Sequence, residues 1–436
     1  MSEFPLVTAA NSVFVLVSFE GPDRYSQAGG LGVRMTGLAQ TLAQLGYETH
    51  SFFVGDPALP GEERLLDGRL VLHRWCQWIS RYYPGGVYDG EEAKLADFTR
   101  SLAPYVIDYV LIPTIASGRM PIVLLEEWQT AETACIVSDE LQRRGMREPA
   151  VLFWNANNTY GFHRIDWQRL ASAATITAVS RYMRAIIRAA GADACVIPNG
   201  ISEELLAPVA RGDVRALRAP ISDDSTSPPS GMFFKMARWE RSKGWTQALE
   251  AVRAARDYGQ RLVLVGRSGG PSNGGDGALV AEAEERRLRG VQVHSEDELR
   301  AQLHPLVRGG ADVISLGFGV SPALARTLYA ASDGVLANSV SEPFGLVGLE
   351  AMAAGGVAYT GGTGEDYAVT GRNAVVLETL DPMEILARWE ALAASTERTA
   401  RLRREAKKTA REYVWPRVVG KLLATVAYQA HKQTAA

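Results

Sequence analysis

Cysteine is scarce in this 436-residue sequence, and its scarcity excludes two classes of protein. The three cysteines, Cys76, Cys135 and Cys195, stand far apart along the chain. Metal sites and disulfide frameworks need cysteines at short, regular spacings, so the sequence predicts neither. Each cysteine is interpreted as a small apolar residue of the interior.

The sequence also lacks a surplus of positive charge and any long apolar run. Its net charge is −3, which provides no general attraction for nucleic acid or for an anionic membrane. The apolar run at 13–19 is too short to span a bilayer, and residues 1–11 lack the basic cluster of a signal peptide. We therefore expect a cytoplasmic protein with no stable membrane insertion and no nucleic-acid partner.

What the sequence does contain is typical of a globular protein with two domains. Hydrophobic residues make up 47% and charged residues 22%, and 436 residues exceed what one core usually supports. The stretch 203–230 is the most loop-like part of the chain, because it combines four prolines with a polar run at 222–227. We predict domains at 1–205 and 206–415, separated within this stretch.

Apolar runs alternate with helical patterns in both halves of the chain. The runs are continuous and rich in β-branched residues, as expected of strands buried on both faces of a parallel sheet. This alternation predicts an α/β fold with two Rossmann-like, doubly wound domains that face a cleft. The predicted strands lie at 13–18, 50–54, 121–125, 151–154, 175–180, 231–237, 261–266, 313–317, 334–338 and 356–360.

The most informative segment is 341–355, where two carboxylates stand eight positions apart. Glu342 precedes a Pro-Phe-Gly turn that ends at Gly345, and Glu350 follows within an apolar helical run. A turn that opens a helix leaves backbone N–H groups without partners, and these groups with the helix dipole attract an anion such as phosphate. The alternative is that both glutamates are ordinary surface acids near a helix start.

The whole segment resembles the E-x7-E signature of the retaining glycosyltransferase family 4, which includes the glycogen synthase relatives. Arg238, five positions before Lys243 and Gly244, resembles the Arg-x4-Lys-Gly element of the same family. The resemblance implies a GT-B fold. It also implies that 206–415 binds the donor nucleotide sugar, that 1–205 lies on the acceptor side, and that a terminal helix at 416–436 crosses back onto the first domain.

The resemblance implies a catalytic role for Glu342, Arg238 and Lys243. The enzyme would move a hexose, with glucose favoured, from a nucleoside-diphosphate sugar to a small or carbohydrate acceptor with retention at the anomeric carbon. Arg238 and Lys243 would stabilise the departing diphosphate, and Glu342 would hold sugar hydroxyls. No D-x-D metal motif stands out, so we expect no essential metal or other cofactor. A UDP-hexose is the favoured donor, with ADP- and GDP-hexoses as alternatives.

Further donor contacts are implied along the same segment and in the first half. The backbone N–H groups of Gly345 and Leu346 would bind the diphosphate, Phe344 would lie against the donor, and Glu350 would hold the ribose hydroxyls. The loop at 27–32 resembles the Lys-Thr-Gly-Gly-Leu-Gly loop of glycogen and starch synthases, which places Gly30 in the donor site. The lysine of that loop is absent from this sequence, in which the preceding residue is Ser26.

The acceptor side departs from the family at several positions. The segment 126–130 is similar to the family's His-Asp-Trp-Gln-Thr segment, but Glu126 and Glu127 replace the histidine and the aspartate. Asn157 occupies the place aligned to a second family histidine, and His163 follows six residues later. Asparagine can hydrogen-bond a hydroxyl but cannot titrate. We take Asn157, His163 and Glu127 as acceptor-side candidates.

These departures keep two alternatives open. One is a non-catalytic, regulatory protein that binds a sugar nucleotide through its second domain. The other is glucan elongation of the glycogen or starch synthase type, which the missing lysine disfavours. Two further patterns have structural interpretations: an aromatic cluster at 75–88 as core or lid, with acceptor stacking as the alternative, and a basic stretch at 398–411 as a solvated helix face.

Overall fold

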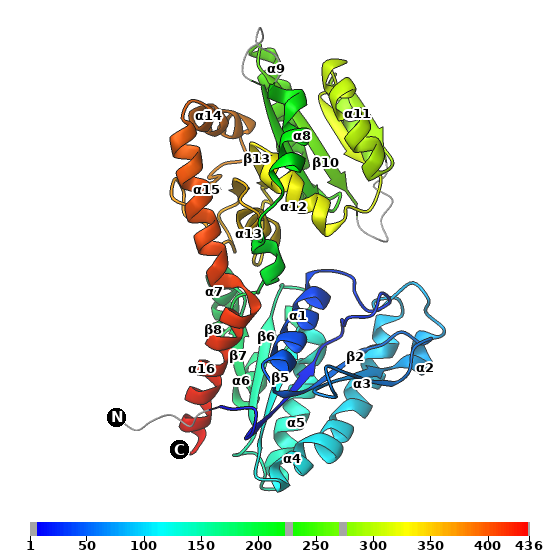
Figure 1. The fold of residues 1–436 in the computed structure, drawn as a ribbon. Coiled ribbons are helices and arrows are strands. Elements are labelled where there is room, and N and C mark those ends of the chain that lie inside the picture. The colour runs from blue at the N-terminus through cyan, green and yellow to red at the C-terminus, as the bar shows by residue number, and fades with distance from the viewer. Residues whose placement is uncertain (1–6, 223–229, 270–276, 435–436) are drawn as a thin grey trace. The chain divides into compact units, whose positions relative to one another are not determined.

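The computed structural model describes residues 7–222, 230–269 and 277–434, and they form two compact units (Figure 1). The first unit comprises Met1–Gly200 and Val414–Ala436, and the second comprises Ile201–Tyr413. The boundary predicted near 205 falls inside η4 (Glu203–Leu206), a 3₁₀ turn of the second unit.

The first unit is built on an eight-stranded sheet within the described residues. All neighbouring strands are parallel except β3 and β4, which pair antiparallel at one edge. Every residue of β1 is buried, which explains why its sequence is a continuous apolar run. The spatial order is β3 (Glu62–Leu65), β4 (Leu70–Trp75), β2 (Glu48–Val54), β1 (Ser12–Val17), β5 (Met120–Glu126), β6 (Val151–Ala156), β7 (Thr175–Ala178) and β8 (Cys195–Val196).

Helices connect and cover these strands. They are α1 (Gly30–Gln44), α2 (Gln77–Ser80), α3 (Glu91–Val106), α4 (Ile112–Ala116), α5 (Ala131–Arg143), α6 (Trp167–Ala173), α7 (Arg181–Ala189) and α16 (Trp415–Thr434). Short turns of other helix types are η1 (Ile107–Leu111), η2 (Trp128–Thr130) and η3 (Phe162–Arg164).

The C-terminal helix α16 belongs to the core of the first unit, as the crossing-back helix of the expected fold. Its apolar face, with Val418, Val419 and Leu422, packs into the same buried cluster as α1 and β1. Trp415 anchors its start, because a Cβ on Gly37 or on Gly200 would meet the indole at 2.2 or 2.4 Å. Both glycines therefore make room for this ring.

The second unit contains a seven-stranded sheet in which every described pairing is parallel. Its order is β11 (Gly290–Val293), β12 (Val313–Leu316), β10 (Arg261–Ser268), β9 (Ser230–Ala237), β13 (Gly334–Ala337), β14 (Ala358–Thr360) and β15 (Val375–Val376). Its helices are α8 (Arg211–Ser222), α9 (Trp245–Asp257), α10 (Ala278–Glu285), α11 (Glu296–Arg308), α12 (Pro322–Ala331), α13 (Leu346–Ala353), α14 (Pro382–Ala393) and α15 (Thr396–Ala410), with turns η5 (Arg241–Lys243) and η6 (Arg411–Tyr413).

Two structural expectations for this unit are wrong. Part of the stretch 203–230, predicted as loop, is helical: α8 forms there, with Leu217 buried and Arg218 donating to the Asp333 carboxylate at 2.7 Å. The part at 223–229, which includes most of the polar run, lies outside the described residues. The basic stretch 398–411 lies on α15, but Arg403 is no solvated side chain. Its guanidinium donates to the carbonyls of Ala330 and Gly355, both at 2.9 Å. These carbonyls lie at the C-terminal ends of α12 and α13, where main-chain carbonyls lack partners within the helix.

Candidate functional site

The two ends of the predicted donor motif meet at the carboxyl edge of the second sheet. Strand β9 runs toward η5, which carries Lys243, and the neighbouring strand β13 leads to Glu342. The Lys243 ammonium donates to Glu342 Oε1 at 2.5 Å, and the Ser339 hydroxyl donates to the same oxygen at 2.7 Å. Thr363, which follows β14, fixes the main chain of Glu342 by accepting from its N–H at 2.9 Å and donating to its carbonyl at 3.1 Å.

The turn after Glu342 has the backbone that the sequence predicts. Gly345 adopts a left-handed conformation with φ of 72°, and α13 begins at the next residue, Leu346. Glycine is needed here for two reasons. A side chain would strain this backbone, and a Cβ would lie 2.7 Å from Cγ of Glu365. Gly364 is confined even more tightly, since its Cβ would meet the carbonyl oxygens of Pro343 and Glu342 at 2.2 and 2.3 Å.

The other predicted donor residues of this unit are more dispersed. The Arg238 side chain is 53% exposed and lies 3.2 Å from Glu240. Glu350 accepts from the Tyr329 hydroxyl at 3.1 Å, and burial raises its pKa to about 7. Phe344 is buried against Tyr367 and Tyr413, which is a packing role. The contacts predicted between these residues and a donor remain predictions.

Two buried titratable groups beside the Lys243–Glu342 pair were not foreseen. Lys235, within β9, donates to the Leu336 carbonyl at 3.1 Å and to Asn338 Oδ1 at 2.5 Å. Burial, with the charge of Lys243, lowers the pKa of Lys235 to about 7. Burial likewise raises the pKa of Glu365 to about 7, and the charge of Glu342 adds to the effect. A lysine inside the apolar run at 231–237 was the one available sequence signal.

A pocket lies next to Glu342, within the same unit. Ser339, the segment 361–363 and the segment 376–380 line it, together with Gln247 and Asn338. Ser339 and Thr363 thus contact both the pocket and Glu342. The lining combines the polar side chains of Ser339 and Thr363 with apolar ones such as Val340 and Leu380. Such a mixed lining can bind a ligand that has both hydroxyl groups and apolar faces.

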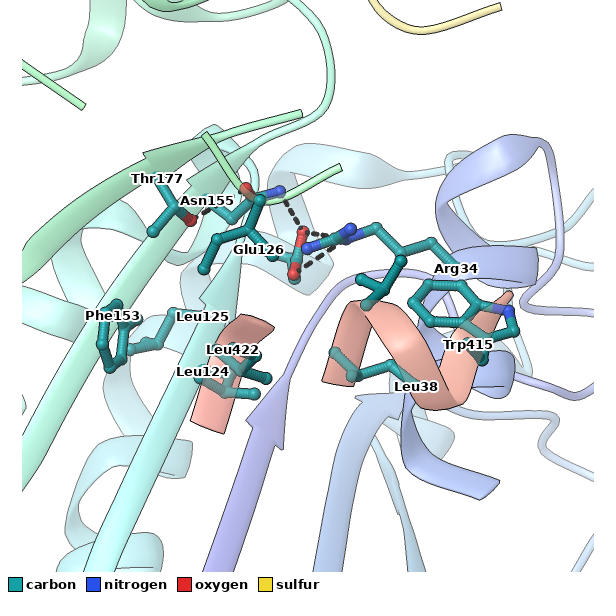
Figure 2. Close-up of a pocket in the computed structure, with 12 residues that line it drawn as sticks. Arg34, Leu38, Leu124, Leu125, Glu126, Phe153, Asn155, Thr177, Trp415 and Leu422 are labelled. Carbon is teal, nitrogen blue, oxygen red and sulfur yellow. Dashed lines mark hydrogen bonds and ion pairs between the residues drawn. The ribbon is translucent and has the colours of Figure 1, made fainter. Parts of the chain in front are cut away.

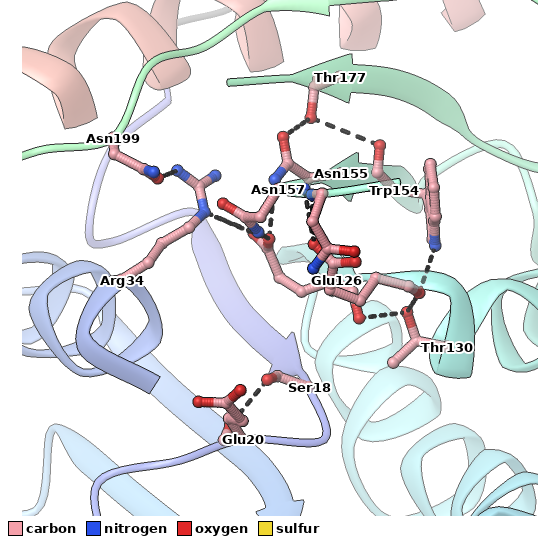
Figure 3. A network of polar contacts seen from close by, with 12 residues as sticks. Ser18, Glu20, Arg34, Glu126, Thr130, Trp154, Asn155, Asn157, Thr177 and Asn199 are labelled. Atoms are coloured by element: carbon pink, nitrogen blue, oxygen red, sulfur yellow. Dashed lines mark hydrogen bonds and ion pairs between the residues drawn. The ribbon is translucent and has the colours of Figure 1, made fainter. Parts of the chain in front are cut away.

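The first unit holds a second polar site, at the carboxyl ends of β5 and β6. Figure 3 shows Glu126 at its centre. The Arg34 guanidinium donates to both Glu126 oxygens at 3.1 and 3.2 Å and to Asn199 Oδ1 at 2.7 Å. The amides of Asn155 and Asn157 donate to Glu126 Oε2 at 2.8 and 2.6 Å. Glu126 is thereby fully engaged and cannot bind substrate without breaking this network.

The acceptor-side candidate Glu127 lies beside this network. Its backbone is left-handed, with φ of 69°, which is costly for a residue with a side chain. Its Oε1 accepts from the N–H groups of Asn157 and Asn158 at 2.6 and 3.1 Å. Burial raises its pKa to about 8. The structure therefore brings Glu127 and Asn157 together, whereas His163 lies exposed on η3.

The glycine-rich loop before α1 is already bound to an anion of the chain itself. Glu20 Oε2 accepts from the N–H groups of Ala28 at 3.1 Å and of Gly29 and Gly32 at 3.0 Å. The donor-binding role predicted for Gly30 remains untested, but the N–H groups around Gly30 are paired with Glu20. The sequence offered no signal for this contact.

A small cavity lies beneath the Arg34–Glu126 ion pair (Figure 2). Its floor is apolar and includes Leu38, Phe153 and Trp415. An apolar floor excludes competing hydrogen-bond partners and so strengthens the ion pair above it. Among the described residues, no group of three or more His, Cys, Asp or Glu side chains could hold a metal ion, and no helix could span a bilayer.

Comparisons with known proteins agree with the motif. Residues 223–409 match the family model described as glycosyl transferases group 1, which confirms the resemblance inferred from the sequence. Curated protein sequences gave no significant match.

Solved structures share the fold across nearly the whole chain. The catalytic domain of starch synthase IV from Arabidopsis thaliana, bound to ADP and acarbose, has 16% identity and a TM-score of 0.66, with 97% of this chain and 99% of that chain covered. Sucrose-phosphate synthase from Thermosynechococcus elongatus has 18% identity and a TM-score of 0.63, with coverages of 95% and 99%. Anabaena HepE, in complex with UDP and glucose, has 14% identity and a TM-score of 0.61, with coverages of 95% and 100%. The predicted GT-B fold is thus confirmed.

Proposed function

Since residues 223–409 of this chain match the family model of group 1 glycosyltransferases, we propose that the protein transfers a hexose from a nucleoside-diphosphate sugar to a hydroxyl-bearing acceptor. Glucose is the favoured hexose and UDP the favoured nucleotide, with ADP and GDP as alternatives, and the anomeric configuration is retained. The observation that carries this proposal is the contact of Lys243 with Glu342 beside the turn at Gly345.

In this proposal Lys243 binds the diphosphate of the donor and Glu342 binds its sugar. The bond between the anomeric carbon and the diphosphate breaks, and the bond from that carbon to the acceptor oxygen forms. Lys243 moves from Glu342 to the diphosphate and stabilises the negative charge that develops there, with Arg238 as a second cation. Glu342, once released, accepts hydrogen bonds from sugar hydroxyls. The acceptor proton passes to a diphosphate oxygen, so the reaction does not depend on the missing family histidine.

Two cations at the diphosphate replace the charge that a divalent metal would supply. We therefore propose that no metal is essential. Turnover that is unchanged by EDTA supports this part of the proposal, and turnover restored by Mg²⁺ or Mn²⁺ after EDTA treatment overturns it.

A donor panel tests the proposed function. The full-length protein is incubated with UDP-, ADP- and GDP-glucose and a set of polyol and sugar acceptors, and diphosphate release is followed. We expect release from one donor, accelerated by an acceptor, and an axial product linkage from an axial donor in the NMR spectrum. The variant Glu342→Ala should lose turnover and keep nucleoside-diphosphate binding. Unchanged turnover in this variant would contradict the site.

The alternative proposal is a protein that binds sugar nucleotides without transfer. The specific observation in its favour is Glu20, which occupies the N–H groups of a loop that resembles the family's donor-side loop. Such a protein gains thermal stability from a nucleotide but releases no diphosphate with any acceptor. Glucan elongation is tested in the same panel by maltooligosaccharides, and we expect no extension of them.

A further inference from the structure

The carboxylate of Glu20 takes the position that a bound phosphate takes in an open glycine-rich loop. Glu20 is 4% exposed, and its Oε2 accepts three backbone N–H groups at the start of α1. These are the groups that helix geometry leaves without partners and that attract an anion. Gly32 permits the close approach, since a Cβ there would lie 3.1 Å from the same oxygen. A phosphate could bind here only by displacing Glu20.

A second contact holds Glu20 in place. The Tyr88 hydroxyl donates to Glu20 Oε1 at 2.7 Å, and the Tyr88 ring stacks on Phe19. The loop that carries Tyr88 is fastened by Lys94, whose buried ammonium donates to the carbonyls of Gly86 and Val87 at 2.8 and 3.2 Å. The aromatic segment at 75–88 thus supports the glycine-rich loop through the contact of Tyr88 with Glu20.

The surroundings of Tyr88 carry negative charge. Burial and the neighbouring carboxylates Glu20, Glu127 and Glu91 all raise the pKa of Tyr88. Of the nearby cations, Arg34 binds Glu126 and Arg164 binds Glu92, while the Lys94 ammonium is held by two main-chain carbonyls and the Tyr25 hydroxyl. The arrangement therefore repels a further anion on this side of the first unit.

Two buried oxygen atoms near Glu20 and Tyr88 lack a hydrogen-bond partner among the described residues. Neither Glu127 Oε2 nor Asn157 Oδ1 has a hydrogen-bond partner within the described part of the chain. Neither side chain can rotate to exchange its two terminal atoms without losing hydrogen bonds. Glu127 Oε1 is held by two backbone N–H groups, and the Asn157 amide nitrogen must face Glu126. Buried polar oxygens without partners are costly, so they suit a ligand that forms hydrogen bonds with them.

We propose that Glu20, Tyr88, Glu127 and Asn157 form an acceptor subsite that binds hydroxyl or ammonium groups and rejects phosphate. Asn157 Oδ1 accepts a hydrogen bond from the ligand. Glu127 Oε2 donates to a ligand hydroxyl while it is protonated and accepts from the ligand once it is ionised. Glu20 prevents an anion from binding to the N–H groups of the glycine-rich loop. The acceptor is therefore a polyol or amino sugar without phosphate at this end. This assignment rests on the proposed function in so far as it names the acceptor.

Binding of three matched probes to the full-length protein tests the subsite. Glucosamine, glucose and glucose 6-phosphate are titrated by calorimetry. We expect glucosamine to bind at least about tenfold more tightly than glucose 6-phosphate, because the Glu20 carboxylate attracts the ammonium of the first and repels the phosphate of the second. Equal or tighter binding of glucose 6-phosphate overturns the proposal, and so does the absence of binding by all three probes.

Variants then assign the selectivity to Glu20. Glu20→Gln should tighten glucose 6-phosphate about tenfold and should not tighten glucosamine. The control Glu132→Gln removes an equal charge from the surface of α5, where Glu132 pairs with Arg169, and should change both affinities less than about twofold. A folded Glu20→Gln protein with the ranking of the unchanged protein contradicts the role of Glu20. If that variant does not fold, the ranking of the three probes decides.

The proposed subsite and the proposed transfer reaction can be contradicted independently. Diphosphate release from the donor panel is measured on the same preparations. Release accompanied by tight binding of glucose 6-phosphate counts against the subsite alone. Binding of glucosamine without release from any donor counts against transfer alone.

Discussion

The ammonium of Lys243 lies 2.5 Å from the carboxylate of Glu342, although 99 positions separate the two residues. They meet because β9 and β13 are neighbouring parallel strands, and the segments that follow such strands emerge at the same edge of the sheet. Each group neutralises the other while no diphosphate is bound. Under the proposed function, the same two residues provide the cation for the diphosphate and the acid for the sugar hydroxyls.

Separate removal of the two partners should have opposite effects on nucleotide binding. Glu342→Gln frees the Lys243 ammonium, so we expect unchanged or tighter binding of nucleoside diphosphate and a turnover lower by about 100-fold. Lys243→Met leaves the Glu342 carboxylate facing the anion, and we expect affinity to fall by about tenfold or more. Calorimetry and initial rates measure both effects. Glu390→Gln, an exposed change on α14, is the control, and equal affinity loss in both site variants would contradict the assignment.

Gly345 and Gly371 form a matched pair for the turn before α13. Both have φ of +72°, but a Cβ on Gly345 would lie 2.7 Å from Glu365, whereas nothing lies within 4 Å of a Cβ on Gly371. Alanine costs about 1 kcal/mol at both positions because the left-handed backbone disfavours a side chain. The clash adds about 1–3 kcal/mol at Gly345 alone. Thermal unfolding of the two variants should show the larger loss for Gly345→Ala, and equal losses would refute the crowding argument.

The stability of the first unit should depend on pH through Glu127. Burial raises the pKa of this carboxyl from 4.5 to about 8, so the folded state holds its proton over a range in which the unfolded state releases it. The contribution to stability is complete below 4.5 and is lost as the pH rises through about 8. Glu127→Gln removes this dependence. Its melting temperature should therefore fall less than that of the unchanged protein between about pH 5 and about pH 9.

Other groups act on the pH profile of the second unit, which provides a check. Glu350 and Glu365 have pKa values of about 7, so their contributions to the stability of the second unit also decrease as the pH rises. The pKa of Lys235 is lowered from 10.5 to about 7, so its contribution rises with pH across that interval and opposes them. Separate unfolding transitions should assign the effect of Glu127→Gln to the first unit. A variant profile parallel to that of the unchanged protein would show that Glu127 does not titrate in this range.

Lys94→Met should loosen the segment that carries Tyr88. The Lys94 ammonium is buried and donates to the Tyr25 hydroxyl at 2.7 Å as well as to two main-chain carbonyls. Methionine fills similar space but leaves these acceptors unpaired, at a cost of about 2–3 kcal/mol. We expect a lower melting temperature and faster hydrogen exchange at 86–88. Lys432→Met, a change near the end of α16, is the control, and unchanged exchange in Lys94→Met would contradict the anchoring role.

The sequence was a good guide wherever one segment contains its own evidence. The continuous apolar runs predicted strands such as β1 and β5, because burial on both faces of a parallel sheet requires apolar residues at every position. The turn at Gly345 was predictable because a left-handed residue before a helix favours glycine. The loop predicted for 203–230 was wrong at 211–222, because the burial of Leu217 stabilises a helix there despite a composition typical of loops.

The site could be predicted only in part, since several of its contacts join distant segments. Nothing near Glu20 in the sequence indicates that its carboxylate binds the N–H groups of 28–32, or that Tyr88 holds it there. Lys235 and Glu365 were overlooked for a related reason. Their altered pKa values follow from burial, and burial depends on how the surrounding strands and loops pack.

By itself, the sequence determined the alternation of strands and helices and the motif formed by Arg238, Lys243 and 342–350, because these are local patterns of hydrophobicity, turn chemistry and spacing. The tertiary structure decided which charges face each other. It pairs Lys243 with Glu342 and places Glu20 in the glycine-rich loop. Such pairings depend on which strand ends and loops become neighbours, and long-range packing alone sets those distances.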